Sequence, residues 1–267
     1  MNIARGGQFS RFSGKGILLF VLMNALLAWP VLAQSSPDVA KATKGLNEWR
    51  GSREAMLMDD FGELARYREA NAKLAAPAKA ERRVVFFGDS ITDGWKLDES
   101  FPGKDYVNRG IGGQTTPQML IRFREDVLDL KPAVVVILAG TNDIAGNTGP
   151  ISLEEIEANC ASMVDLARVH GVKVVLSSVL PVHNYTERAA DFFPLRSPEN
   201  ILELNRWMQE YCKGKHCVYL DYFSALVDAK GFMKKELAED GLHPNAAGYA
   251  IMAPLAEKAI GKGLAGK

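Results

Sequence analysis

The sequence has few cysteines, few histidines and no concentrated block of basic side chains. Its 267 residues include three cysteines and four histidines, and 32 basic residues are matched by 32 acidic ones. No spacing of Cys and His is typical of a metal site, so we expect no bound metal. Without a basic patch the footprint of a nucleic-acid binder is missing, and we expect no nucleic-acid partner.

The three cysteines also exclude a dense disulfide framework. Cys212 and Cys217 flank a Lys-Gly-Lys-His turn, so they either pair in an oxidising compartment or remain free thiols. Cys160 falls at the apolar spacing of a helix, and we expect it to be a buried thiol.

The first 33 residues have the pattern of a signal peptide. Arg5, Arg11 and Lys15 precede an apolar run over Ile17–Trp29, and the small-residue site Val31-Leu32-Ala33 follows. A membrane anchor is the alternative, but the run is shorter than the roughly 20 residues that span a bilayer. We therefore expect cleavage after Ala33, a periplasmic or secreted protein and no stable membrane anchor. The remaining 29 basic and 32 acidic residues give a net charge of −3.

The rest of the chain divides into two regions. Residues 34–80 are charged and helical in pattern, with Leu57, Phe61 and Leu64 on the apolar face. We expect this region to be a helical arm that packs on the main domain. Residues 81–267 form that domain, because no internal repeat or low-complexity linker divides them.

Short apolar runs alternate with amphipathic helical patterns along residues 81–267. Such alternation is typical of a parallel sheet that is covered on both faces. With right-handed crossovers it predicts a three-layer α/β/α sandwich around a five-stranded, flavodoxin-like sheet. We expect a last helix from Asn245 to about Ile260, broken at Pro254. The predicted strands are Val84–Phe87, Tyr106–Asn108, Val134–Leu138, Val172–Leu176 and Val218–Leu220.

Small and polar residues follow four of the predicted strands. In open parallel sheets, ligands bind outside the carboxyl ends of the strands, so these residues are the candidates for a functional site. The four segments are Gly88-Asp89-Ser90, Gly110-Ile111-Gly112-Gly113, Ala139-Gly140-Thr141-Asn142-Asp143 and Ser177-Ser178.

Ser90 is the candidate nucleophile. It directly follows the first strand and would begin the next helix, where backbone N–H groups and the helix dipole favour negative charge. The alternative is an ordinary helix N-cap, because serine is a preferred cap residue. Ser90 does not lie in the G-x-S-x-G pentapeptide of α/β-hydrolases.

A serine nucleophile needs a base, and four histidines are available. His170 precedes Gly171 at a helix end, His216 lies in a surface turn and His183 lies in a loop. His243 follows Asp240 by three residues, so one turn can bring the carboxylate to one imidazole nitrogen and leave the other for a hydroxyl. The alternative is an Asp-Gly turn with an incidental histidine.

Acyl transfer also needs donors for the oxyanion. The Asn142 side-chain amide and the backbone N–H groups of Gly113 and Ser90 are the candidates, with Gly112 in place of Gly113 if the loop register differs by one. Plain turn chemistry is the alternative, since Gly and Asn are common turn residues.

Taken together, these segments resemble the GDSL/SGNH hydrolases from about Arg82 to Ile260. Asn108–Gly113 and Gly140-Thr141-Asn142 are most similar to the platelet-activating-factor acetylhydrolase branch and its bacterial relatives. The resemblance implies a Ser90–His243–Asp240 triad, and an oxyanion hole from Ser90, Gly113 and Asn142. It implies an esterase that works through an acyl-enzyme without a metal or an organic cofactor.

The substrate is expected to be a small-molecule, glycan or lipid ester. An exported enzyme with small residues around the catalytic serine favours removal of a small acyl group, above all acetyl, from carbohydrate. A lysophospholipase or thioesterase is the alternative, and a non-catalytic carbohydrate- or lipid-binding module is the alternative of another class. The loop 181–198 is expected to wall the substrate pocket with His183, Tyr185, Phe192 and Phe193, or else to anchor itself to the core through these aromatic rings.

Overall fold

The computed structural model describes residues 36–78 and 81–265. The predicted signal peptide, residues 1–33, lies outside the described residues. Ser35–Lys267 forms one compact unit, which contains both the predicted arm and the predicted main domain. None of the described helices combines the length and the apolar character that a membrane crossing requires.

A five-stranded parallel sheet forms the centre of this unit, in the order β2-β1-β3-β4-β5. The strand order reverses between β1 and β3, and the ends of these two strands are the place where open α/β sheets bind ligands. The structure confirms the predicted three-layer α/β sandwich. The strands are β1 (Val84–Gly88), β2 (Tyr106–Gly110), β3 (Val134–Leu138), β4 (Lys173–Ser177) and β5 (Val218–Leu220).

Alternate strand residues point into two apolar cores, one on each face of the sheet. Val85, Phe87 and Ile137 pack under α5, α7 and α8. Val84 and Phe86 pack on the opposite face under α10. The helices are α1 (Pro37–Asp59), α2 (Arg68–Lys73), α3 (Ser90–Asp93), α4 (Leu97–Ser100), α5 (Thr116–Asp126), α6 (Thr141–Ile144), α7 (Leu153–Val169), α8 (Pro198–Tyr211), α9 (Phe223–Leu226) and α10 (Ala246–Ala265).

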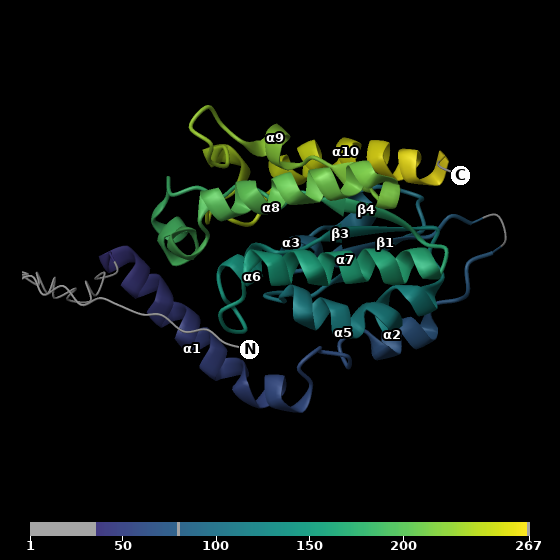
Figure 1. Cartoon of the computed structure of the whole chain (residues 1–267), viewed down its shortest axis with the longest axis horizontal. Coiled ribbons are helices and arrows are strands. Elements are labelled where there is room, and N and C mark those ends of the chain that lie inside the picture. Colours follow the sequence, from purple (N-terminus) through teal and green to yellow (C-terminus); the bar gives the residue numbers. More distant parts are fainter. Residues whose placement is uncertain (1–35, 79–80, 266–267) are drawn as a thin grey trace, which may run out of the picture. The chain divides into compact units, whose positions relative to one another are not determined.

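The predicted arm consists of two helices rather than one continuous helical pattern. The carboxylate of Asp60 accepts hydrogen bonds from the backbone N–H groups of Leu64 (2.9 Å) and Ala65 (2.9 Å), which stabilises a turn directly after α1. α1 lies beside the end of the sheet that carries α3 and α6 (Figure 1). Phe61, expected on the apolar face, is 39% exposed.

The last helix continues through Pro254, contrary to the predicted break. α10 runs unbroken from Ala246 to Ala265. Met252, Ala256 and Ile260 are buried against the sheet on both sides of the proline. Packing of this face stabilises the helix despite the hydrogen bond that proline cannot donate.

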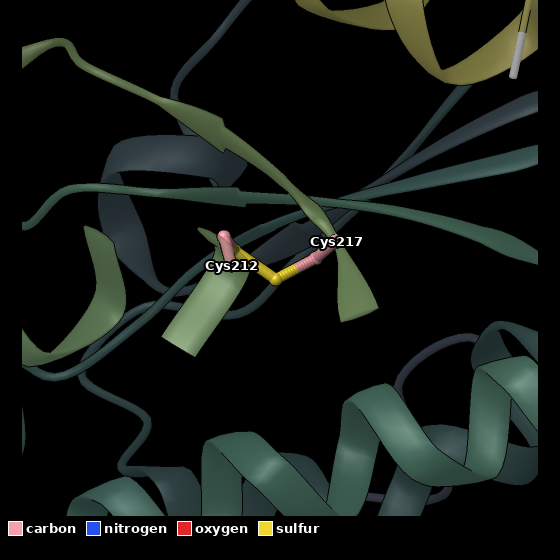
Figure 2. The surroundings of a disulfide bond; sticks show 2 residues. All are labelled: Cys212 and Cys217. Carbon is pink, nitrogen blue, oxygen red and sulfur yellow. A yellow bond between two sulfur atoms is a disulfide. The ribbon is translucent and has the colours of Figure 1, made fainter. Parts of the chain in front are cut away.

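Cys212 and Cys217 form a disulfide that links the end of α8 to the start of β5 (Figure 2). Their Cα atoms lie 4.7 Å apart, within the usual range for such a bond. Cys160 is a buried free thiol, as the sequence predicted, and burial raises its pKa.

Candidate active site

Ser90 is the first residue of α3 and is separated from the end of β1 by Asp89. The side chain of Asp89 caps this helix by accepting a hydrogen bond from the Ile91 N–H (2.9 Å). The helix-capping role that sequence alone left open for Ser90 therefore belongs to Asp89. The Ser90 hydroxyl instead lies 2.9 Å from Nε2 of His243.

His243 connects Ser90 to a carboxylate. Its Nδ1 lies 2.7 Å from Oδ2 of Asp240, while Oδ1 of Asp240 accepts the backbone N–H groups of His243 (2.8 Å) and Leu242 (3.0 Å). Burial alone would raise the pKa of Asp240, but these hydrogen bonds and the His243 side chain hold that pKa well below its usual value. An ionised Asp240 fixes the tautomer in which Nδ1 carries a proton and Nε2 accepts one from the serine.

His183 supports the loop that carries Asp240 and His243. Its Nε2 lies 2.7 Å from the carbonyl oxygen of Ala238, and its backbone N–H donates to the carbonyl of Gly241 (2.9 Å). Gly241 has a φ of +79°, and a Cβ there would lie 2.3 Å from the carbonyl oxygen of His183, so only glycine fits. His183 is fully buried behind the loop, so of the two alternatives that the sequence left for the rings of loop 181–198, pocket wall or anchor, it takes the second.

The predicted oxyanion donors gather beside Ser90. Asn142 lies in α6, just beyond the end of β3, and Gly113 lies in the loop after β2. Both residues line the same pocket as Ser90 and His243, whereas Gly112 is not among the lining residues. Gly113 has a φ of +79°, and its carbonyl accepts a hydrogen bond from the Asn147 side chain (2.8 Å). This bond holds the loop in place at the pocket.

Arg196 fixes the orientation of the Asn142 amide. Nη2 of Arg196 donates to Oδ1 of Asn142 (3.0 Å), and Nε donates to the hydroxyl of Thr141 (3.2 Å). Burial lowers the pKa of Arg196 to about 10, so the guanidinium stays charged at neutral pH. Because a guanidinium only donates, the acceptor end of the amide must face it. The Asn142 Nδ2 group then donates one hydrogen to the carbonyl of Gln114 (3.1 Å) and has one left for a ligand.

A second buried arginine joins the loops around the site. Arg122 of α5 donates to the carbonyl oxygens of Gly88 (2.9 Å) and Arg109 (2.9 Å). It also contacts the Gln114 side chain and pairs with Asp126 at 3.0 Å. One fully buried side chain thus connects the ends of β1 and β2 with the loop that carries Gly113.

Sequence reasoning assigned no role in the site to Arg196 or Arg122. Arg196 bonds to a residue 54 positions away and Arg122 to one 34 positions away, so no local pattern reveals either contact. The one local sign for Arg122 is its place beside Met119 and Phe123, on the side of α5 that is buried against the sheet.

Asp89 has an unusual environment for a carboxylate. It is fully buried, and its Oδ2 atom has no hydrogen-bond partner among the described residues. Burial raises the pKa of Asp89 to about 6, although the Ile91 N–H, His243 and Arg196 favour its charged form. The group next to the candidate nucleophile therefore titrates much closer to neutrality than an ordinary aspartate.

A pocket of about 370 Å³ opens above Ser90 and His243. Of the four loop residues for which the sequence allowed either a place in the wall or an anchoring role, only Phe192 lines the pocket, with its ring edge-to-face against His243 at 5.5 Å. Tyr185 stacks on His183 and donates to Asp228 (2.6 Å), and Phe193 packs against Phe232, so both rings anchor the loop instead. α1 supplies a wall that sequence reasoning did not expect, through Lys41, Ala42, Gly45, Leu46 and Trp49.

The site holds the parts that ester hydrolysis needs: a hydroxyl bonded to an imidazole, a carboxylate that orients the imidazole, and amide donors beside the hydroxyl. Among the described residues, no group of three or more His, Cys, Asp and Glu side chains is arranged to hold a metal ion.

Known proteins share this arrangement of strands and motifs. Residues 86–251 match the model of the GDSL-like lipase/acylhydrolase family. The solved structure of a GDSL-like lipase from Bacteroides thetaiotaomicron is 41% identical, with a TM-score of 0.70 over 76% of this chain and 98% of that chain.

Two curated relatives extend the comparison. The uncharacterized lipoprotein YqeF of Bacillus subtilis is 36% identical over 37% of this chain and 49% of its own length. The chain thus spans about half the length of that relative. The acetylxylan esterase of Geobacillus stearothermophilus is 26% identical over 67% of this chain and 94% of its own length.

Proposed function

Because the chain belongs to the GDSL-like lipase/acylhydrolase family, we propose that it is a serine esterase that uses Ser90, His243 and Asp240. The observation that carries the proposal is the continuous chain of hydrogen bonds from the Ser90 hydroxyl through the imidazole to the carboxylate, at 2.9 and 2.7 Å. A hydroxyl that only capped its helix would not need this arrangement.

The reaction has two steps. Nε2 of His243 takes the Ser90 proton as Oγ bonds to the ester carbonyl carbon, and the same nitrogen returns the proton to the departing alcohol oxygen as the carbon–oxygen bond breaks. Water then repeats the sequence on the acyl-enzyme and releases the acid. In both steps the backbone N–H groups of Ser90 and Gly113 and the free hydrogen of Asn142 stabilise the negative oxygen.

We propose a small acyl ester, with acetyl as the first candidate, as the substrate. The relative from Geobacillus stearothermophilus is named an acetylxylan esterase, which supports a carbohydrate-bound acetyl group. Export to the periplasm or the medium, where such glycans occur, follows from the predicted signal peptide and is part of the proposal. The relative YqeF, named a lipoprotein, supports an extracytoplasmic location.

Replacement of the nucleophile tests the proposal. We expect Ser90→Ala to reduce hydrolysis of p-nitrophenyl acetate to background and to abolish labelling by a fluorophosphonate probe, because among the described residues the Ser90 hydroxyl is the hydrogen-bond partner of Nε2 of His243. Ser177→Ala is the matched control: it removes a buried serine at the end of β4 that donates to the carbonyl of Ile137 (3.0 Å), outside the pocket. A Ser90→Ala protein that stays active, or a wild type that the probe does not label, would refute the assignment.

A further inference from the structure

One face of α1 lines the pocket instead of packing into one of the two cores. Gly45 and Leu46 are adjacent, and each lies three or four residues from Ala42 and from Trp49, so the four residues share one side of the helix. All four line the pocket together with Ser90 and His243. Ala42 is the only buried residue of α1. The apolar side chains of Leu46 and Trp49 therefore remain partly exposed, and what they face is the pocket.

α1 is held to both sides of the pocket. Near the start of α1, Lys41 forms an ion pair at 3.4 Å with Asp191, which precedes Phe192 in the loop. Further along, Nε of Arg50 donates to the carbonyl of Asn147 (3.2 Å), beside the oxyanion loop. The ring of Trp49 covers Gly113 so closely that a Cβ on this glycine would lie 2.6 Å from the ring. These contacts place α1 beside the site, where it forms part of the pocket wall.

The pocket is larger and more apolar than an acetyl group requires. Its volume of about 370 Å³ lies within the roughly 300–1,000 Å³ of sites that enclose drug-sized ligands. Phe192, Leu195 and Leu242 supply further apolar side chains to the pocket lining. These apolar side chains favour contact with a hydrocarbon group over contact with water.

We propose that this face of α1 binds an apolar group of the ester substrate and so sets the length of chain that the enzyme accepts. The inference rests on the proposed serine-esterase function, and it favours an ester with an apolar acyl or alcohol group over the carbohydrate-bound acetyl group named first. An apolar chain reaches this wall from either end of the ester, as the acyl group or as the alcohol. Substrate series that vary one end at a time distinguish these two sources.

Gly45 offers a substitution that fills the pocket without disturbing the fold. A Cβ at Gly45 meets nothing within 4 Å, so Gly45→Leu extends a side chain into the pocket from an intact helix. Gly51→Leu is the matched control: it lies on the same helix, its Cβ also meets nothing within 4 Å, and it does not line this pocket. Both changes raise helix propensity equally, so only the filling of the pocket differs.

The experiment measures kcat/KM for two series, p-nitrophenyl esters of increasing acyl length and acetate esters of increasing alcohol length. We expect Gly45→Leu to lower kcat/KM, relative to the wild type, by about tenfold more for the longest member of one series than for its shortest member. The reason is that loss of the space for a single methylene group in an apolar pocket lowers kcat/KM by about tenfold or more. The series that responds identifies the end that α1 contacts. Gly51→Leu should leave both profiles within about twofold of the wild type.

Leu46→Ala gives an independent readout by removing apolar surface instead of adding it. We expect KM for the longer esters of the responding series to rise by about three- to tenfold, with kcat little changed, because binding before and during the reaction is weakened equally. Length profiles that keep their shape in Gly45→Leu would overturn the role of α1 even in an active enzyme. A wild type inactive on every ester would instead overturn the proposed function.

Discussion

Removal of the Asn142 amide should lower kcat by about two to three orders of magnitude while the protein stays folded. One Nδ2 hydrogen of Asn142 is used by the Gln114 carbonyl at 3.1 Å, and Arg196 holds the opposite end of the amide, so a single hydrogen remains for the oxyanion. Loss of one such donor raises the barrier by about 2.7–4 kcal/mol in comparable sites. At about 1.36 kcal/mol per decade this gives the stated decrease. The assay is the kcat of Asn142→Ala with p-nitrophenyl acetate.

Asn205→Ala is the matched control for this variant. Asn205 is also a buried asparagine with two hydrogen bonds, to the backbone N–H (2.7 Å) and carbonyl (2.9 Å) of Val179, but it lies outside the pocket. Each variant should lose stability through its unmade hydrogen bonds, at about 1 kcal/mol per bond. Only Asn142→Ala should lose kcat by orders of magnitude. A kcat within tenfold of the wild type in Asn142→Ala would refute the oxyanion role, whatever the stability.

Two further predictions concern stability. Burial raises the pKa of Asp89 from 3.8 to about 6, so the contribution of this group to the stability of the folded protein is complete below pH 3.8 and is lost as the pH rises through 6. Relative to Asp89→Asn, the free energy of unfolding of the wild type should fall by about 3 kcal/mol between pH 3.5 and pH 7, as measured by urea titrations. Parallel pH dependences of the two proteins would contradict this reasoning. The Cys212–Cys217 disulfide closes a loop with a sequence separation of 5, for which loop entropy predicts a stabilisation of roughly 2 kcal/mol. The double variant Cys212→Ser, Cys217→Ser should lose this amount of unfolding free energy. Equal urea midpoints for the oxidised wild type and the double variant would show that the loop is ordered without the bond.

The elements of the fold were readable from the sequence because their signals are local. Four of the five strands contain a short apolar run, whereas β2 includes Asn108 and Arg109, and the predicted strand from Val134 to Leu138 has the observed bounds. The two errors also have local causes. A proline normally ends a helix, but at Pro254 the burial of α10 against the sheet keeps the chain helical. Beyond α1, the Asp60 turn depends on a side chain that accepts two backbone N–H groups, which residue spacing does not reveal.

The candidate site was readable only in part. Ser90, Gly113, Asn142 and His243 stand at strand ends or loops, and the rule for parallel sheets brings such positions together. The roles of Arg196 and the α1 face depend on packing between distant segments, which a single sequence does not encode in any local pattern. His183 illustrates the same limit, since a polar loop residue with an expected place in the pocket is buried behind the loop that carries Asp240 and His243.

The hydrogen bond between Ser90 and His243 joins residues that are 153 positions apart, and it has a consequence for folding. Ser90 follows the first strand to be synthesised in the sheet, whereas His243 comes after the last. Contacts of such high sequence separation form late, because closing a long loop is entropically unfavourable until the intervening chain is ordered. A chain with its early strands and helices formed, but with α10 still undocked, therefore has an exposed serine and no base beside it. We therefore expect hydrolytic activity to appear late in refolding, when the segment that carries His243 docks beside Ser90.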